Sequence, residues 1–192
     1  SVDSIFYAMK ANSNPEILRA LEGEGINFEC VSPGEIHRLL ELFPDIDRKR
    51  LLFTPNFAPR SEYQWGLDQG TWVTLDNLHP LRYWPKIFKN REIFIRIDTG
   101  EGQGHHEHVR TAGTYSKFGI PLQEIEEMED LLKGAGARVV GLHAHTGSGI
   151  LQTDNWRVTG ERLLALRDNF PELRFLDLGG GLGIAEKRGE RG

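Results

Sequence analysis

The sequence has 192 residues, a length typical of one domain or of part of a larger one. Twenty-three Lys and Arg residues against 28 Asp and Glu residues give a net charge of -5, so we expect no nucleic-acid partner. We expect no membrane association and no secretion either, because no apolar run approaches ~18 residues and the first residues show no basic-then-apolar leader. A single cysteine, Cys30, cannot form an internal disulfide, which is typical of a cytoplasmic protein.

Short apolar runs separated by helical patterns predict an α/β fold. The runs are nearly continuous in apolar residues rather than alternating, which is typical of parallel strands buried on both faces. Seven such runs occur, at 5–9, 27–31, 51–54, 72–75, 93–97, 139–143 and 174–178.

Signals for the starts of helices lie between these runs. Asn14 followed by Pro15 offers an N-cap and a proline at the first helical position, and Ser32 with Glu35 forms a capping-box pattern. Apolar residues at helical spacing follow at 17–21, 36–43, 122–132 and 154–170. This βαβα order predicts a parallel sheet with short connections.

Polar residues follow nearly every run, and their distribution distinguishes two parallel-sheet folds. A doubly wound sheet concentrates its ligand-binding groups at one switch point, whereas a barrel takes them from the ends of many strands. The candidates are Lys10, Ser32, Asn56, Asp76, Asp98, His145 and the glycines 179–181. We therefore predict an α/β fold of the (β/α)8 TIM-barrel type that is incomplete, because only about seven βα units are present.

Lys10 follows the first run directly. A lysine at the carboxyl end of a barrel strand points into the barrel mouth, where desolvation favours the neutral amine that forms a Schiff base. Lysine side chains are mostly exposed in proteins, so a solvated lysine that opens a loop is the alternative.

Gly179, Gly180 and Gly181 follow the last run, and with Leu182 and Gly183 they form the glycine segment (179–183). Successive glycines let backbone amides approach an anion closely, as in phosphate-binding loops. The spacing does not fit the dinucleotide pattern GxGxxG, and no GK[ST] follows, so those two interpretations lose their main support. A flexible turn is the alternative.

The sixth run continues into a second polar stretch, the histidine segment (143–149). Thr146, Ser148 and the glycine amides are suited to bind another edge of the same phosphate. His145 is suited to lie flat on an aromatic ring.

A metal site is the main alternative for this segment. His143 and His145 would supply two nitrogens, and Asp98 would add a carboxylate. One core histidine and one loop histidine is the structural alternative. A further histidine-rich stretch at 104–108 has polar, glycine-rich surroundings, which equally suit a loop over the barrel mouth.

Taken together, these motifs resemble the fold type III (alanine-racemase-like) family of PLP-dependent enzymes, and within it the diaminopimelate decarboxylases. Five matching pieces span nearly the whole chain in order: YAMKAN (7–12), ECVSPGE (29–35), SKFG (116–119), HAHTGS (143–148) and LDLGGG (176–181). The stretches 28–35, 54–57 and 104–111 look most like the decarboxylase half of bacterial bifunctional aspartate kinase/diaminopimelate decarboxylases, without the kinase portion.

The resemblance implies a role for each candidate residue. Lys10 would be the catalytic residue that holds pyridoxal 5'-phosphate (PLP) covalently, and His145 would stack on the pyridine ring. The phosphate would be held by groups at two strand ends, namely Ser148, Gly179, Gly180 and Gly181. No metal is implied, and the stretch 102–116 would correspond to the loop that closes over substrate.

The resemblance also implies a reaction and a partner. The family members most like this chain decarboxylate meso-diaminopimelate to L-lysine and CO2, in lysine biosynthesis. Relatives build their active sites across a dimer interface, so we expect a homodimer of the full-length protein.

The sequence departs from the family pattern in two ways. Glu29 stands where many relatives have Asp, and the chain stops at Gly192, before the family's Glu-Pro-Gly-Arg segment, its partner-subunit cysteine and its C-terminal β-domain. We therefore expect residues 1–192 to be a PLP-binding barrel domain truncated at its C-terminal end and inactive alone.

Three other functions stay open at this point. The first is decarboxylation of ornithine, arginine or carboxynorspermidine, and the second is a non-catalytic PLP-binding barrel. The third is a metal-dependent barrel hydrolase that uses the histidine segment, which leaves Lys10 and the glycine segment without a shared explanation.

Overall fold

A computed structural model describes residues 2–100 and 117–184 of the chain. Two compact units can be distinguished, Ser1–Leu75 and Asp76–Gly192. Each unit is built from parallel strands and the helices that connect them. Over the described residues, no helix has the length and apolar character needed to cross a membrane.

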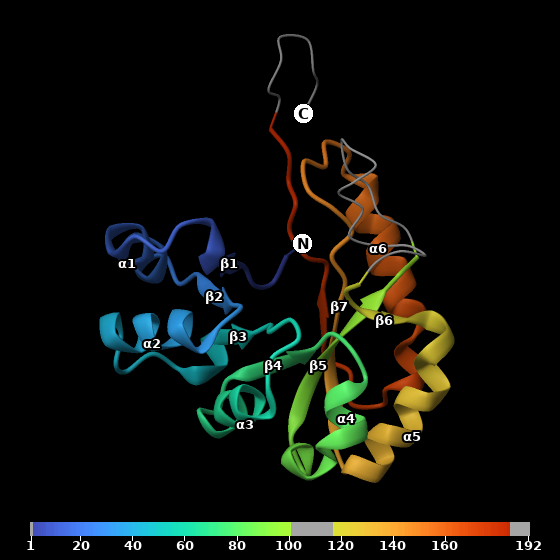
Figure 1. Ribbon diagram of the computed structural model, residues 1–192. Coiled ribbons are helices and arrows are strands. Elements are labelled where there is room, and N and C mark those ends of the chain that lie inside the picture. The colour runs from blue at the N-terminus through green and yellow to red at the C-terminus, as the bar shows by residue number, and fades with distance from the viewer. Residues whose placement is uncertain (1, 101–116, 185–192) are drawn as a thin grey trace. The chain divides into compact units, whose positions relative to one another are not determined.

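The first unit contains a parallel sheet in which the strands pair in chain order (Figure 1). Its strands are β1 (Phe6–Ala8), β2 (Asn27–Cys30), β3 (Leu51–Phe53) and β4 (Trp72–Leu75). Its helices are α1 (Pro15–Gly23), α2 (Pro33–Leu42) and α3 (Arg60–Asp68), with 3-10 turns η1 (Met9–Ala11) and η2 (Arg48–Arg50).

The helix starts in this unit follow the caps predicted from the sequence. The Asn14 side chain accepts a hydrogen bond from the amide of Glu16 (2.9 Å), which fixes the first turn of α1. Ser32 Oγ accepts from the amide of Glu35 (3.3 Å), and the Glu35 carboxylate accepts from the amide of Val31 (2.6 Å). The capping box is thus present, although Glu35 reaches one residue further back than the usual pattern.

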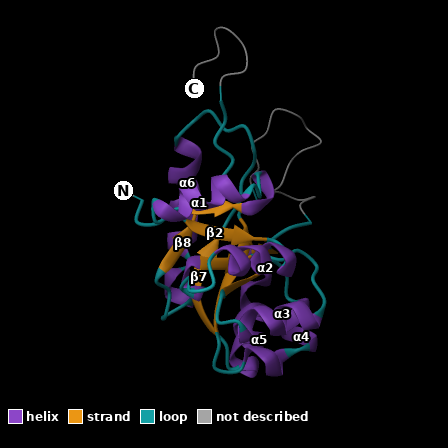
Figure 2. Cartoon of the chain, turned by 90° about the vertical axis from the view of Figure 1, so that its left-hand side faces the viewer, coloured by secondary structure: helices purple, strands orange, loops and turns teal. Residues whose placement is uncertain are grey.

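The second unit has three strands that pair side by side and one short strand that pairs with the first of them. The strands are β5 (Glu92–Asp98), β6 (Ile120–Pro121), β7 (Arg138–His143) and β8 (Phe175–Asp177). Strand β7 pairs in parallel with β5 on one side and with β8 on the other. Figure 2 shows β7 and β8 side by side. The helices are α4 (His79–Tyr83), α5 (Ile125–Ala135) and α6 (Asp154–Ala165), with 3-10 turns η3 (Pro85–Phe88), η5 (Leu122–Glu124) and η6 (Arg167–Asn169).

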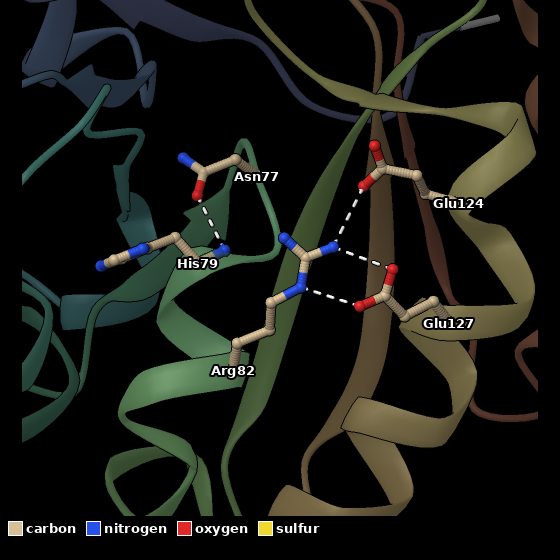
Figure 3. A network of polar contacts seen from close by, with 5 residues as sticks. All are labelled: Asn77, His79, Arg82, Glu124 and Glu127. Atoms are coloured by element: carbon tan, nitrogen blue, oxygen red, sulfur yellow. Dashed lines mark hydrogen bonds and ion pairs between the residues drawn. The ribbon is translucent and has the colours of Figure 1, made fainter.

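A polar network joins α4 to α5 on the surface of the second unit (Figure 3). Arg82 forms two hydrogen bonds of 2.8 Å to the carboxylate of Glu127 and lies 3.8 Å from Glu124. The loop before α4 is held by Asn77, whose side-chain oxygen accepts from the amide of His79 (3.0 Å). The Arg82 guanidinium lowers the pKa of the Glu127 carboxyl, which keeps the pair ionised. Because these charges are exposed, the network contributes little to the free energy of unfolding, and its main effect is to orient the two helices.

The seven predicted strands are all present within two residues of their predicted bounds. The pattern missed α3 and α4, because α4 has only five residues and α3 carries few apolar side chains. It also missed β6, whose two residues form a strand only through pairing with the end of β5. The long pattern at 154–170 is interrupted, since α6 ends at Ala165 and a 3-10 turn follows.

Candidate active site

The histidine segment and the glycine segment lie side by side at the carboxyl ends of β7 and β8. The amide of Ala144 donates to the carbonyl of Asp177 (2.9 Å). Two further backbone bonds continue the contact, from the Ile150 amide to the Gly181 carbonyl (2.8 Å) and from the Gly183 amide to the Ile150 carbonyl (2.9 Å). Parallel pairing therefore extends from the strands into both polar segments.

At two glycines of the glycine segment, this close approach coincides with a positive φ. Gly179 has a φ of +68°, and a Cβ there would lie 2.6 Å from the carbonyl oxygen of Ala144. Gly181 has a φ of +90°, and a Cβ there would overlap the carbonyl oxygen of Gly147. Both positions combine a left-handed backbone with a contact that leaves no space for a side chain.

Gly180, between them, has a different environment. A Cβ on Gly180 would meet no atom within 4 Å, so this side of the turn is open. The Gly179 amide donates to the Asp177 side chain (2.8 Å), whereas the amides of Gly180 and Gly181 have no acceptor within the described part of the chain. Two available amides beside an open face are what a phosphate group requires. The glycine segment therefore fits the phosphate of PLP.

The two other predicted residues of this unit belong to the same surroundings. His145 is half-buried, and its Nδ1 lies 3.0 Å from the position of a Cβ on Gly179, so the imidazole lies against the glycine turn. Ser148 is exposed in the same segment. The structure thus brings together His145 and the glycine segment, with Ser148 three residues further along.

Lys10 belongs to the other compact unit. It lies in η1, directly after β1, and its side chain is exposed. The Tyr7 hydroxyl donates to the carbonyl of Asn12 (3.1 Å), a bond that closes the turn around Lys10. Lys10 thus follows a parallel strand as predicted, and its approach to the glycine segment stays a prediction.

A row of charged and polar side chains crosses the sheet of the second unit next to the histidine and glycine segments. Arg96 of β5 is paired in register with His143 of β7, and His143 is paired with Asp177 of β8. Residues in register on parallel strands point to the same face. His143 is buried and its Nδ1 lies 3.9 Å from the Asp177 carboxylate.

This row bears on the metal-site alternative. His143 faces Asp177, while the Asp98 side chain accepts a hydrogen bond from the amide of Gly100 (3.0 Å) in its own loop. Within residues 2–100 and 117–184, no cluster of three His, Cys, Asp or Glu side chains could hold a metal ion. The arrangement gives this alternative no support, and the stretch 104–108 lies outside the described residues, as does most of the predicted 102–116 loop.

Sequence reasoning missed Arg96 and Asp177 as site residues. A signal was present, because Arg96 is the one charged residue of the run 93–97 and Asp177 stands between two leucines in the run 174–178. Charged side chains are rarely placed among apolar strand residues unless they have partners or a function. The partners themselves became apparent only through the register of β5, β7 and β8.

Asp76 is a buried carboxyl in this unit, and the effect of its burial can be tested by varying the pH. It is 2% exposed, and its Oδ2 has no hydrogen-bond partner among the described residues. Burial raises the pKa of Asp76 above its ordinary value of 3.8, although a hydrogen bond from Asn77 and the charge of Arg96 oppose the shift.

We expect the free energy of unfolding of Asp76→Asn to increase, relative to that of the native protein, as pH rises from about 4 towards neutrality. A carboxyl whose pKa is raised by folding binds protons more tightly in the folded state, so its contribution to stability is lost as pH rises through the folded pKa. Urea unfolding of both proteins across this range measures the difference. A difference in the free energy of unfolding that does not change with pH would contradict the raised pKa of Asp76.

The chain matches a family model along almost its whole length. The family is described as "Pyridoxal-dependent decarboxylase, pyridoxal binding domain", and residues 2–191 match it. Diaminopimelate decarboxylase of Methanothermobacter thermautotrophicus is 38% identical over 186 residues, which are 94% of this chain and 43% of that protein.

Solved structures give the same relationship. A point mutant of diaminopimelate decarboxylase from Helicobacter pylori, in complex with L-lysine, has a TM-score of 0.85 and 28% identity, over 97% of this chain and 50% of that one. The protein SrLDC, solved with PLP and cadaverine, has a TM-score of 0.74 and 28% identity, over 94% of this chain and 45% of that one. The chain thus spans about half the length of the relatives that it matches.

These likenesses confirm the fold class predicted from the sequence, an α/β fold that is an incomplete (β/α)8 barrel. They also confirm PLP as the cofactor of the family, for which the glycine segment offers a fitting phosphate site. The chain belongs to the pyridoxal-dependent decarboxylases, and it carries their pyridoxal-binding domain.

Proposed function

We propose that the chain is the PLP-binding part of a decarboxylase that converts meso-diaminopimelate to L-lysine and CO2. The observation that carries this proposal is the glycine segment, which is packed backbone to backbone against the histidine segment, has an open position at Gly180, and carries two amides without an acceptor among the described residues. The similarity to diaminopimelate decarboxylases at 38% identity supports the choice of substrate.

Each predicted site residue has a role in this proposal. Lys10 would be the residue that holds the cofactor through its amine, and His145 would lie against the cofactor ring. Ser148, Gly179, Gly180 and Gly181 hold the phosphate through a hydroxyl and backbone amides. By fixing the cofactor, these groups would set the orientation in which the bond to the substrate carboxylate is cleaved. When bound, PLP supplies the electron sink for the pair of electrons that the departing CO2 leaves behind.

The proposal extends to the organisation of the whole protein. Residues 1–192 act as a single barrel domain, and the full-length protein works as a homodimer in the cytoplasm, without a nucleic-acid partner. The sequence stretches 28–35, 54–57 and 104–111 support a closer relation to the decarboxylase half of bifunctional aspartate kinase/diaminopimelate decarboxylases.

The test uses the full-length protein and has two parts. PLP is added, the visible absorbance band is recorded, and borohydride then fixes the cofactor for peptide mapping. We expect the label on Lys10, because an amine bound covalently to PLP is reduced in place. CO2 release is then compared for meso-diaminopimelate, ornithine, arginine and carboxynorspermidine, with diaminopimelate expected to be turned over fastest.

The possible outcomes separate the competing functions. Label on another lysine would end the assignment of Lys10. Label on Lys10 with faster turnover of another amino acid would retain the decarboxylase and change its substrate. Tight PLP binding with no CO2 release from any of the four would favour a non-catalytic PLP-binding barrel.

A further inference from the structure

The histidine segment needs an anchor outside itself. Its glycines Gly147 and Gly149 have φ values of 153° and 70°, so backbone freedom is high on both sides of Ser148. The backbone bonds that flank this segment are made by Ala144, to Asp177 at the end of β8, and by Ile150, just after the segment, to Gly181 and Gly183. Between Ala144 and Ile150, one side chain, Thr146, is almost fully buried, with 4% of its surface exposed.

Thr146 is held by the first turn of α6. Its Oγ1 accepts a hydrogen bond of 2.6 Å from the side-chain amide of Asn155. Asn155 is itself fixed, since its carbonyl accepts from the Thr159 hydroxyl (2.7 Å) and its amide donates to the carbonyl of Gln152 (3.3 Å). The bond is therefore made between a buried hydroxyl and a side chain whose backbone is already ordered.

The position of Asn155 is fixed because helix α6 packs against the sheet. Leu163 is fully buried, and Gly160 faces the side chain of Leu178, with a Cβ there 3.6 Å from Leu178 Cδ2. In the last turn of α6, Arg162 donates to the carbonyl of Thr99 (2.9 Å), directly after β5.

Asn155, Thr159 and Arg162 are spaced i, i+4 and i+7, so they lie on one face of α6. This face borders a polar cavity of about 110 Å³, whose lining includes Thr99, Thr146 and Asn155. The helix thus connects the end of β5 with the segment that follows β7.

We propose that Asn155 is a positioning residue that, through Thr146, keeps the histidine segment against the glycine segment and so slows the loss of PLP. This inference rests on the proposed function, because it assumes that His145 and Ser148 contact the cofactor. Asn155 itself need not touch PLP. Its effect is on the orientation of His145 and Ser148, which lie on either side of Thr146 in the chain.

The experiment measures the rate at which PLP leaves the full-length protein after dilution into a PLP scavenger. Asn155→Ala removes the donor and Thr146→Val removes the acceptor with little change of volume. We expect each to speed PLP release about five- to tenfold, the effect of losing one well-placed hydrogen bond. The visible circular dichroism of the bound cofactor should weaken in the same variants, since it reports the asymmetry of the site.

Two comparisons distinguish positioning from a general loss of stability. Thr146→Ser keeps the hydroxyl and should release PLP at nearly the native rate. The double variant should be no faster than either single variant, because both remove the same bond. Asn169→Ala is the matched control, since it removes an exposed asparagine hydrogen bond to Glu129 (2.8 Å) elsewhere in the unit.

The inference is overturned if Asn155→Ala and Thr146→Val lower the melting temperature but release PLP at the native rate, or if their effects add in the double variant. A full-length protein that binds no PLP overturns both this inference and the proposed function. PLP bound at Lys10 with unchanged release in the variants overturns this inference alone.

Discussion

Lys10→Ala in the full-length protein is expected to abolish borohydride fixation of PLP and to lower turnover by a factor on the order of 10³ or more. The physical reason is that a covalent link to the cofactor needs an unprotonated amine, and alanine offers none. Residual non-covalent binding should persist, because the glycine segment would still offer its amides to the phosphate. Absorbance spectra, labelling and CO2 release measure these three effects.

Lys133→Ala is the matched control for this experiment. Lys133 is exposed in the last turn of α5, so its loss removes a lysine of similar exposure from a surface helix. We expect labelling and turnover of this variant to match those of the native protein. Native turnover by Lys10→Ala would show that the chemistry depends on another amine.

Gly181→Ala is expected to destabilise the protein by about 2–4 kcal/mol and to disorganise the candidate site. The new Cβ would overlap the carbonyl oxygen of Gly147, which is backbone and cannot rotate away. The φ of +90° adds strain, since L-residues rarely adopt it. Urea unfolding and the affinity for PLP should both report the loss.

Gly180→Ala, one residue away, separates the two effects. Its Cβ would meet no atom within 4 Å, and its φ is not positive, so we expect the free energy of unfolding to change by less than about 1 kcal/mol. PLP affinity should still fall, because a methyl group would enter the open space beside the amides. Equal destabilisation by both substitutions would contradict the packing described for the two segments.

Much of the fold was predictable because the signals are local. Nearly continuous apolar runs identified all seven main strands, and Asn14 and Ser32 act as the caps that their side chains predict. In contrast, β6 was not predictable, because its two residues become a strand only by pairing with β5. Helix α4 is too short to show a period of 3.6 residues.

The candidate site shows the same division between local and non-local information. The presence of His145, Ser148 and three glycines after strand runs was apparent from the sequence. That Gly179 and Gly181 are sterically required while Gly180 is not depends on Ala144 and Gly147, over 30 residues earlier in the chain. The bond from Asn155 to Thr146 has no sequence signal, because any Asn near the start of a helix looks the same.

The sequence alone determined the order of strands along the chain, the positions of the polar segments and the resemblance to PLP-dependent decarboxylases. The spacing of apolar residues and the spacing of motifs depend only on neighbours along the chain. Only the tertiary structure decided that His143 lies beside Asp177, and that Arg96 lies in the same row. The reason is register: which residues meet across parallel strands depends on how whole elements pack, and no single segment carries that information.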